Sequence, residues 1–159
     1  MKGLLVLIAF ILVFFIFLIS SCESPQDLNR PGDKMDGFIT YVDSNLIRNG
    51  GYYSVSVYNA DYSDPFNSQP IAIDSLVHYK VGIHYEAQFS FDGIPAGRFY
   101  VASTWSRYPK IPNEIPIVLG IYGCDTSFNC ATPTVIIYPN TNGNFRNITS
   151  WTDTTKRVY

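Results

Sequence analysis

The stretch 89–105, FSFDGIPAGRFYVASTW, decides the fold of this chain. Pro95 fixes its own φ angle and Gly97 can adopt a positive φ, so residues 93–97 suit a tight change of direction. β-branched and aromatic residues on either side of this segment favour an extended backbone. The stretch therefore predicts two strands joined by a corner, around which the rest of the chain packs as further strands.

In the strand that follows the corner, side chains should alternate between two faces. Phe99 and Val101 would share one face, and Tyr100 and Ala102 would share the other. One of these faces is expected to line the core.

Other segments rich in β-branched and aromatic residues alternate with turn residues along the chain. The clearest, residues 53–58, alternates apolar and small polar side chains as a half-buried strand should. Residues 59–70 and 106–116 contain Pro, Asp and Asn without an apolar period and predict loops. The remaining predicted strands are 37–42, 71–76, 79–81, 83–91, 117–122, a buried strand at 134–138, and 145–151 after a turn at 140–144.

The composition agrees with this pattern. Aromatic residues make up 16% of the chain and charged residues only 15%, which favours a β-rich secreted protein over a helical cytosolic one. The formal net charge of −2 offers no basic surface for nucleic acid. We expect an all-β fold, a single antiparallel Greek-key β-sandwich of about seven strands, preceded by an N-terminal signal helix.

The first 22 residues combine a charged start, a long apolar run and a cysteine, a pattern typical of targeting segments. Lys2 supplies a positive start, residues 3–19 are an unbroken apolar run, and small residues precede Cys22. The segment 19–22, ISSC, therefore resembles a bacterial lipobox, with the Cys22 thiol carrying a diacylglycerol and Cys22 becoming the first residue of the mature chain. With two or three acyl chains, attachment would be stable, because each buried CH₂ contributes about 0.8 kcal/mol.

An uncleaved membrane anchor is the alternative, because the apolar run reaches the lower length limit for crossing a bilayer. Either interpretation ties the protein to a membrane. Residues 22–35 are rich in Pro, Gly and polar residues without an apolar period and predict a flexible tether. The expected organisation is therefore a signal peptide at 1–21, a tether at 22–35 and a β-sandwich domain at 36–159.

The chain has three cysteines, and acylation of Cys22 would leave an even number of free thiols. The remaining two, Cys124 and Cys130, have a spacing that suits a disulfide-closed loop in an oxidising compartment. So short a ring would contribute on the order of 2 kcal/mol, which holds a loop shape more than a fold. A metal site is the rival interpretation, but it needs more ligands than these two thiols and lacks a nearby histidine.

Four residues are weak candidates for metal ligands. His78 and His84 flank a turn at Gly82, and they could face each other across a hairpin and bind copper or zinc. Asp61 and Asp64 share a loop and offer oxygen ligands for calcium, although their spacing is not that of an EF-hand. Exposed strand histidines and ion-free loop acids are the commoner outcome, so we predict no metal and no other cofactor.

Catalytic motifs are missing from the sequence. It contains no Gly-x-Ser-x-Gly elbow, no phosphate-binding glycine loop and no His-Glu-x-x-His run, and glutamate is scarce. We therefore predict no catalytic residue and no enzymatic activity.

Aromatic side chains are the remaining candidates for ligand contact, because flat rings on loops can stack on sugars or anchor a protein interface. Trp105, Tyr108 and Trp151 are the three to consider, with core packing as the alternative role for each ring. Tyr108 lies in a proline-rich loop and is the ring expected to be exposed.

Residues 91–102 resemble the Ile-Pro-Ala-Gly-Xaa-Tyr-Xaa-Val signature of prealbumin-like modules, the carboxypeptidase regulatory-like and Cna-B-like β-sandwiches of bacterial surface lipoproteins. Residues 119–123 support the resemblance, which covers roughly residues 37–152. It implies a sandwich that serves as a stabilising or recognition module. Hydroxyisourate hydrolases share this architecture, but their Tyr-Arg-Gly-Ser tail is missing here, so no catalytic residue is transferred.

The expected function is that of a non-enzymatic protein of the bacterial cell envelope, lipid-anchored to a membrane on its periplasmic or surface-exposed side. It would act in protein–protein contact with an envelope partner or as a structural accessory. A carbohydrate-binding lipoprotein that uses loop aromatics, with a glycan as its partner, is the alternative.

Overall fold

The computed structural model describes residues 34–43, 50–138 and 146–159, which belong to one compact unit spanning residues 31–159. The predicted signal peptide, Cys22, most of the tether and the turn at 140–144 lie outside the described residues. Within the described ranges, no helix is long and apolar enough to cross a membrane.

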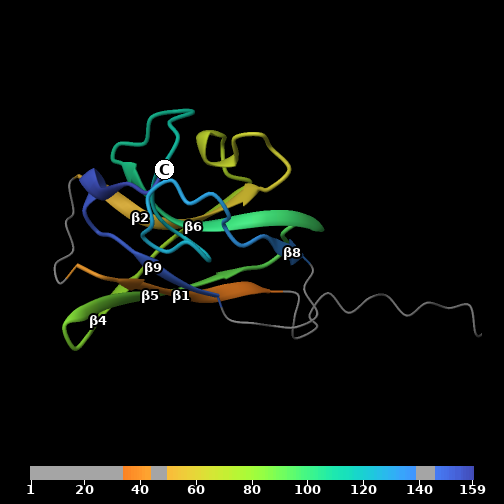
Figure 1. Cartoon of the computed structure of the whole chain (residues 1–159). Helices are drawn as coiled ribbons and strands as arrows, with labels where there is room; N and C mark the ends of the chain where they lie inside the picture. The colour runs from red at the N-terminus through yellow and green to blue at the C-terminus, as the bar shows by residue number, and fades with distance from the viewer. Residues whose placement is uncertain (1–33, 44–49, 139–145) are drawn as a thin grey trace, which may run out of the picture. The chain divides into compact units, whose positions relative to one another are not determined.

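The unit is mostly β, as the sequence predicts, and its strands form two sheets (Figure 1). Most strands begin and end within a few residues of the predicted bounds. In the described residues these elements are β1 Met35–Tyr41, β2 Gly51–Asn59, η1 Pro65–Asn67, β3 Ala72–Ser75, β4 His78–Val81, β5 His84–Phe91, β6 Gly97–Arg107, β7 Ile117–Ile121, β8 Ile136–Tyr138, β9 Arg146–Ser150 and η2 Thr154–Lys156.

The first sheet has the order β4-β5-β1-β9. β1 pairs antiparallel with β5 but parallel with β9, where Gly37 lies opposite Arg146 and Tyr41 opposite Ser150. The expectation of a wholly antiparallel fold is therefore wrong at this pair. No hairpin joins these two strands, which lie at opposite ends of the described chain, so turn geometry does not dictate their relative direction.

The second sheet has the order β3-β2-β6-β7 and is antiparallel throughout. β8 joins the same edge of β6 as β7, pairing with residues 97–99 while β7 pairs with residues 102–105. β8 was predicted to be a buried strand, but its central residue Ile137 is exposed. Side chains alternate along a strand, so Ile136 and Tyr138 belong to the core while Ile137 points to the opposite face.

The predicted corner joins the two sheets, since β5 belongs to the first sheet and β6 to the second. Gly93, with φ of 72°, makes the left-handed bend, whereas Gly97 does not have a positive φ. Ile94 turns into the core between these glycines. The corner is thus anchored by an apolar side chain as well as shaped by its glycine.

Side chains from both sheets share one core. Phe99 and Val101 of β6 meet Val55 and Val57 of β2 and the inner residues of β1 and β5 in a single cluster. The predicted alternation along β6 is confirmed, because Ala102 lies in a second cluster on the opposite face. β6 therefore has apolar contacts on both faces.

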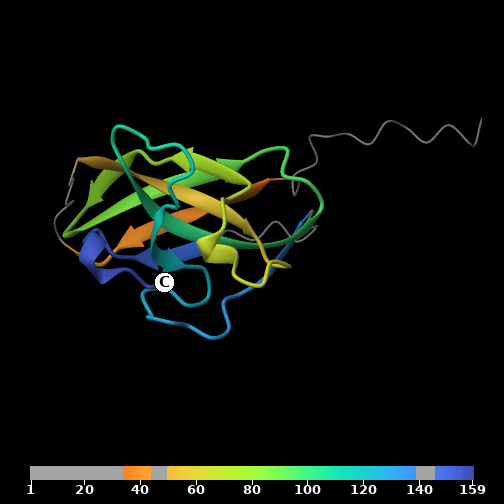
Figure 2. The ribbon, with the colours of Figure 1, turned by 90° about the horizontal axis from the view of Figure 1, so that it is seen from above.

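The outer face of the second sheet is covered by loops and by the segment after β9 (Figure 2). Phe66 of η1, Cys124 and Val158 pack onto it. The Val158 amide donates to the Val118 carbonyl of β7 at 2.9 Å, which adds an extended segment beside that strand. These contacts explain why β2, β6 and β7 are buried on both faces.

A buried hydroxyl cluster lies on this outer face. Thr104 Oγ1 is 2.9 Å from Ser54 Oγ and 2.8 Å from Ser56 Oγ, and it also donates to the Ser54 carbonyl at 3.2 Å. None of the three side chains is exposed to solvent. Buried hydroxyls need such partners, because an unsatisfied one costs roughly 1–3 kcal/mol.

Replacing Thr104 by valine tests this cluster. The isosteric change keeps the packing volume but removes the acceptor that the two serine hydroxyls share, so we expect Thr104→Val to lower the free energy of unfolding by about 1–3 kcal/mol in urea titrations. Thr132→Val, at an exposed position, is the matched control and should change stability by less than about 0.5 kcal/mol. Equal stability of the two variants would contradict the assignment.

Candidate functional site

Three aromatic rings gather on the outer side of the second sheet, and with two polar neighbours they form what we call the aromatic surface (Phe66, Tyr100, Tyr159, Asp64 and Asn67). The ring of Phe66 is central, with centroids 5.5 Å from Tyr100 and 4.9 Å from Tyr159. Pro65 starts the short helix η1 and sets Phe66 against the sheet. Tyr159 stays partly exposed at the rim of this group.

Asp64 holds the polar side of the aromatic surface. Its carboxylate accepts a hydrogen bond from Asn67 Nδ2 at 2.8 Å and another from the Tyr159 hydroxyl. The Tyr159 hydrogen bond, followed by the Asn67 bond, lowers the pKa of Asp64 below its ordinary value. The same contact with Asp64, more than burial, raises the pKa of Tyr159.

The carboxylates of Asp61 and Asp64, which were considered as calcium ligands, bind other side chains of the protein. Asp61 Oδ1 lies 3.0 Å from Nη1 of Arg98 in an exposed ion pair, and Asp64 bonds to Asn67 and Tyr159. In the described residues, no three His, Cys, Asp or Glu side chains come close enough together to hold a metal ion. The loop carboxylates act instead as local ties between η1, β6 and the segment after η2.

His78 and His84 do not face each other, so the arrangement considered for a copper or zinc site does not occur. His84 pairs with Val81 across a tight hairpin, and His78 lies three residues before Val81, which puts the two imidazoles on opposite faces of the sheet. His78 packs beside the rings of Tyr41 and Tyr53, with centroids 5.1 and 5.2 Å away. The register of the two-residue turn, which sequence alone left open, decides this outcome.

The three aromatic residues predicted for ligand contact have different environments. Trp105 is only 7% exposed and belongs to the core, so it cannot stack on a ligand in this structure, and its selection was wrong. Trp151 is half-buried, with Lys156 Nζ 4.2 Å from its ring centroid. Tyr108 is exposed, as predicted for the proline-rich loop.

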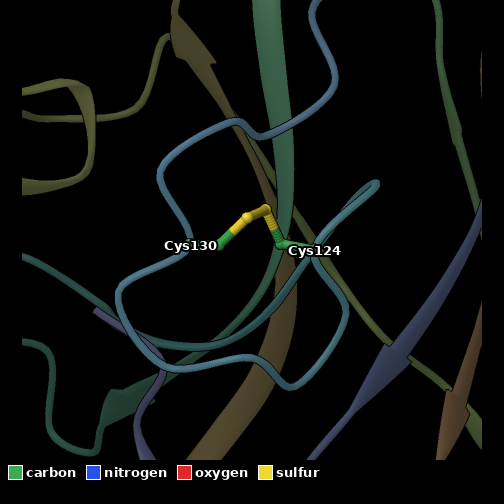
Figure 3. The surroundings of a disulfide bond; sticks show 2 residues. All are labelled: Cys124 and Cys130. Carbon is green, nitrogen blue, oxygen red and sulfur yellow. A yellow bond between two sulfur atoms is a disulfide. The ribbon is translucent and has the colours of Figure 1, made fainter.

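Cys124 and Cys130 lie together with a Cα–Cα distance of 5.9 Å and are joined as a disulfide (Figure 3). This separation is within the range that unstrained backbones allow. The loop they close is tied to its neighbours, because Asp125 Oδ1 accepts from the Thr149 amide at 3.0 Å and the Asn129 amide donates to the Val158 carbonyl at 3.0 Å. The disulfide thus fixes a loop that holds β9 and the Val158 segment in place.

The aromatic surface was not found by sequence reasoning, because its rings come from positions 66, 100 and 159. The one available signal was the outward alternation of Tyr100 along β6. Chemically, the surface offers ring edges, a carboxylate and an amide, which are groups that recognise a polar partner. It presents no paired nucleophile and base for covalent chemistry.

Comparison with protein-family models, with curated proteins and with solved structures finds no match to this chain.

The contact between Tyr159 and Asp64 gives a measurable prediction. In Tyr159→Phe, the pKa of the Asp64 carboxyl should rise toward its ordinary value, as followed by carbon-detected NMR titration. The sign follows from the lowered pKa: the hydrogen bonds to Asp64 stabilise the fold at neutral pH and are lost as pH falls through that lowered pKa.

Asp153 is the internal control for this titration. Its pKa is also lowered, mainly by the Thr155 amide, whose nitrogen lies 2.9 Å from Asp153 Oδ1. Its titration should be the same in both proteins. An unchanged pKa at Asp64, or an equal shift at Asp153, would contradict a specific bond from Tyr159.

Proposed function

We propose that this protein is a non-enzymatic, lipid-anchored component of a bacterial cell envelope that serves as an interaction or structural accessory module. The observation that carries the proposal is the apolar run 3–19 followed by ISSC at 19–22. The joined Cys124 and Cys130 support it, because disulfides persist in oxidising compartments outside the cytosol. Cys22 is the proposed attachment point of the lipid.

The described domain is proposed to be a prealbumin-like Greek-key sandwich. The shared core of the two sheets supports a sandwich. Between β3 and β6 the chain passes to the first sheet, where it forms β4 and β5. It then returns to the second sheet, where β6 pairs with β2, and a long return of this kind is typical of a Greek key. β1 and β2 lie in different sheets, which argues against the immunoglobulin constant-domain order, where the first two strands share a sheet.

A contact function fits the side chains that the domain presents. The two carboxylates of the loop beside the aromatic surface have structural partners, Asp64 with Tyr159 and Asp61 with Arg98. Backbone hydrogen bonds also join the two sheets. The Trp151 amide, just after β9, donates to the Leu119 carbonyl of β7 at 3.1 Å, which favours a rigid domain. An envelope protein is the partner we propose.

Carbohydrate binding is the second candidate, and the aromatic surface is the observation that favours it. Tyrosine rings beside a carboxylate and an amide can stack on a sugar and accept hydrogen bonds from its hydroxyls. Tyr100, Tyr159 and Asp64 would make these contacts, with Tyr108 as a separate exposed ring.

Mild crosslinking in the native envelope, followed by purification of the full chain and mass spectrometry, tests the first candidate. We expect one stoichiometric protein partner, and a glycan array probed with the same purified protein should be silent. A positive array without a protein partner would overturn the contact function in favour of sugar binding.

Two variants locate the sugar contact if the array is positive. Tyr159→Ala should abolish the signal, because it removes the exposed ring of the aromatic surface and its bond to Asp64. Tyr79→Ala, which removes an exposed tyrosine from the other sheet, is the matched control and should retain it.

A further inference from the structure

An exposed apolar stripe runs along the edge of the first sheet. Tyr79 and Val81 alternate with His78 and Lys80 along β4, Val77 precedes the strand with the same spacing, and Ile83 continues it into the turn. The stripe consists of these four apolar residues, Val77, Tyr79, Val81 and Ile83. Val77 is 82% exposed and Ile83 is 71% exposed. Period-two spacing puts the strand members of the stripe on one face of the edge strand.

The end of the stripe protrudes as a two-residue turn. Val81 pairs with His84, so Gly82 and Ile83 alone form the connection, and Gly82 has φ of 61°. A Cβ added at Gly82 would meet no atom within 4 Å, and Ile83 is largely exposed, so both turn residues face open space. Hairpin turns usually carry Asn, Asp or Ser beside glycine, and an isoleucine there has no role in turn geometry.

Val42 extends the apolar character at this end of the sheet. It follows Tyr41, whose partner in β5 is Tyr85, so it lies next to the hairpin tip and is itself exposed. Figure 1 shows the β4–β5 hairpin at the end of the sheet opposite the start of β1.

The shape and chemistry of this edge suit contact with a lipid surface better than pairing with a strand of another protein. β4 has only four residues, and Lys80 lies within it, a feature that blunts edge strands against pairing with another chain. A convex tip with Ile83 at its apex needs a concave or deformable partner. A lipid surface provides the deformable one, and valine, isoleucine and tyrosine are side chains that the membrane interface accepts.

The proposed anchor can reach this edge. Residues 22–33 separate Cys22 from the described chain and span at most about 40 Å when extended. The seven residues of β1, which separate its start from the hairpin end of the sheet, span about 23 Å. An anchor at Cys22 therefore permits the domain to lie with the hairpin tip on the same membrane.

We propose that the stripe formed by Val77, Tyr79, Val81 and Ile83 is a membrane-contact site that lays the domain on the lipid surface. This inference rests on the proposed lipid anchor at Cys22. It leaves the aromatic surface, which belongs to the other sheet, available for a partner.

Single-site fluorescent labelling tests the contact. The full chain with Ile83→Cys is purified from bacterial membranes, labelled with an environment-sensitive fluorophore and reconstituted into vesicles of phosphatidylethanolamine and phosphatidylglycerol. Ile137→Cys is the matched control, since Ile137 is the same residue type, is 66% exposed and lies in β8 near the corner, at the other end of the domain. We expect a blue shift and quenching by lipid-borne nitroxide at position 83 and at least fivefold less quenching at position 137.

The possible results separate this inference from the proposed anchor. Acylation of Cys22 is read independently from the mass of the same labelled protein. Position 83 remaining as water-exposed as position 137 on acylated protein would overturn the membrane contact and leave the anchor standing. Shielding of position 83 only after envelope proteins are added would also overturn it, because a protein would then be the occupant.

Discussion

The burial of β6 on both faces is the constraint on which the rest of the structure depends. One face of this strand supplies Phe99 and Val101 to the core between the sheets, and the other carries Ala102 and Thr104 beneath the covering loops. Because both faces are covered, the side chains that pack against β6 must fit the space between the layers. The buried hydroxyl of Thr104 also needs hydrogen-bond partners, which Ser54 and Ser56 of β2 supply. The loops and the Val158 segment are therefore part of the fold and do not simply connect strands.

Sequence patterns predicted the parts of the fold that depend on local chemistry. The corner at 93–97, the strand at 53–58 and the turn at Gly82 follow from glycine, proline and alternation, and all three occur in the structure. Sequence patterns did not predict the features that depend on contacts between distant segments. The parallel pairing of β1 with β9, the burial of Trp105 and the meeting of residues 66, 100 and 159 depend on packing between segments that no local window contains.

The surfaces of the domain suggest a division of roles. In the aromatic surface, Asp64 accepts hydrogen bonds from Asn67 and from the partly exposed Tyr159, which holds the Tyr159 ring in place and lowers the entropic cost of binding. The stripe presents three exposed aliphatic side chains and the ring of Tyr79, whose hydroxyl contacts Glu86 of β5. A surface with fixed hydrogen-bonding groups suits a specific partner, and a largely apolar edge suits a lipid surface that has no fixed shape.

Intact and peptide mass spectrometry of the protein isolated from native membranes tests the central claim most directly. The account predicts a chain that begins at Cys22, carries a diacylglycerol on that residue, and yields a peptide pair in which Cys124 and Cys130 are joined. A Cys22→Ser variant should lose the lipid, whereas Ser21→Ala, which keeps a small residue before the cysteine, should retain it. A chain that keeps residues 1–21 with an unmodified Cys22 would contradict the account.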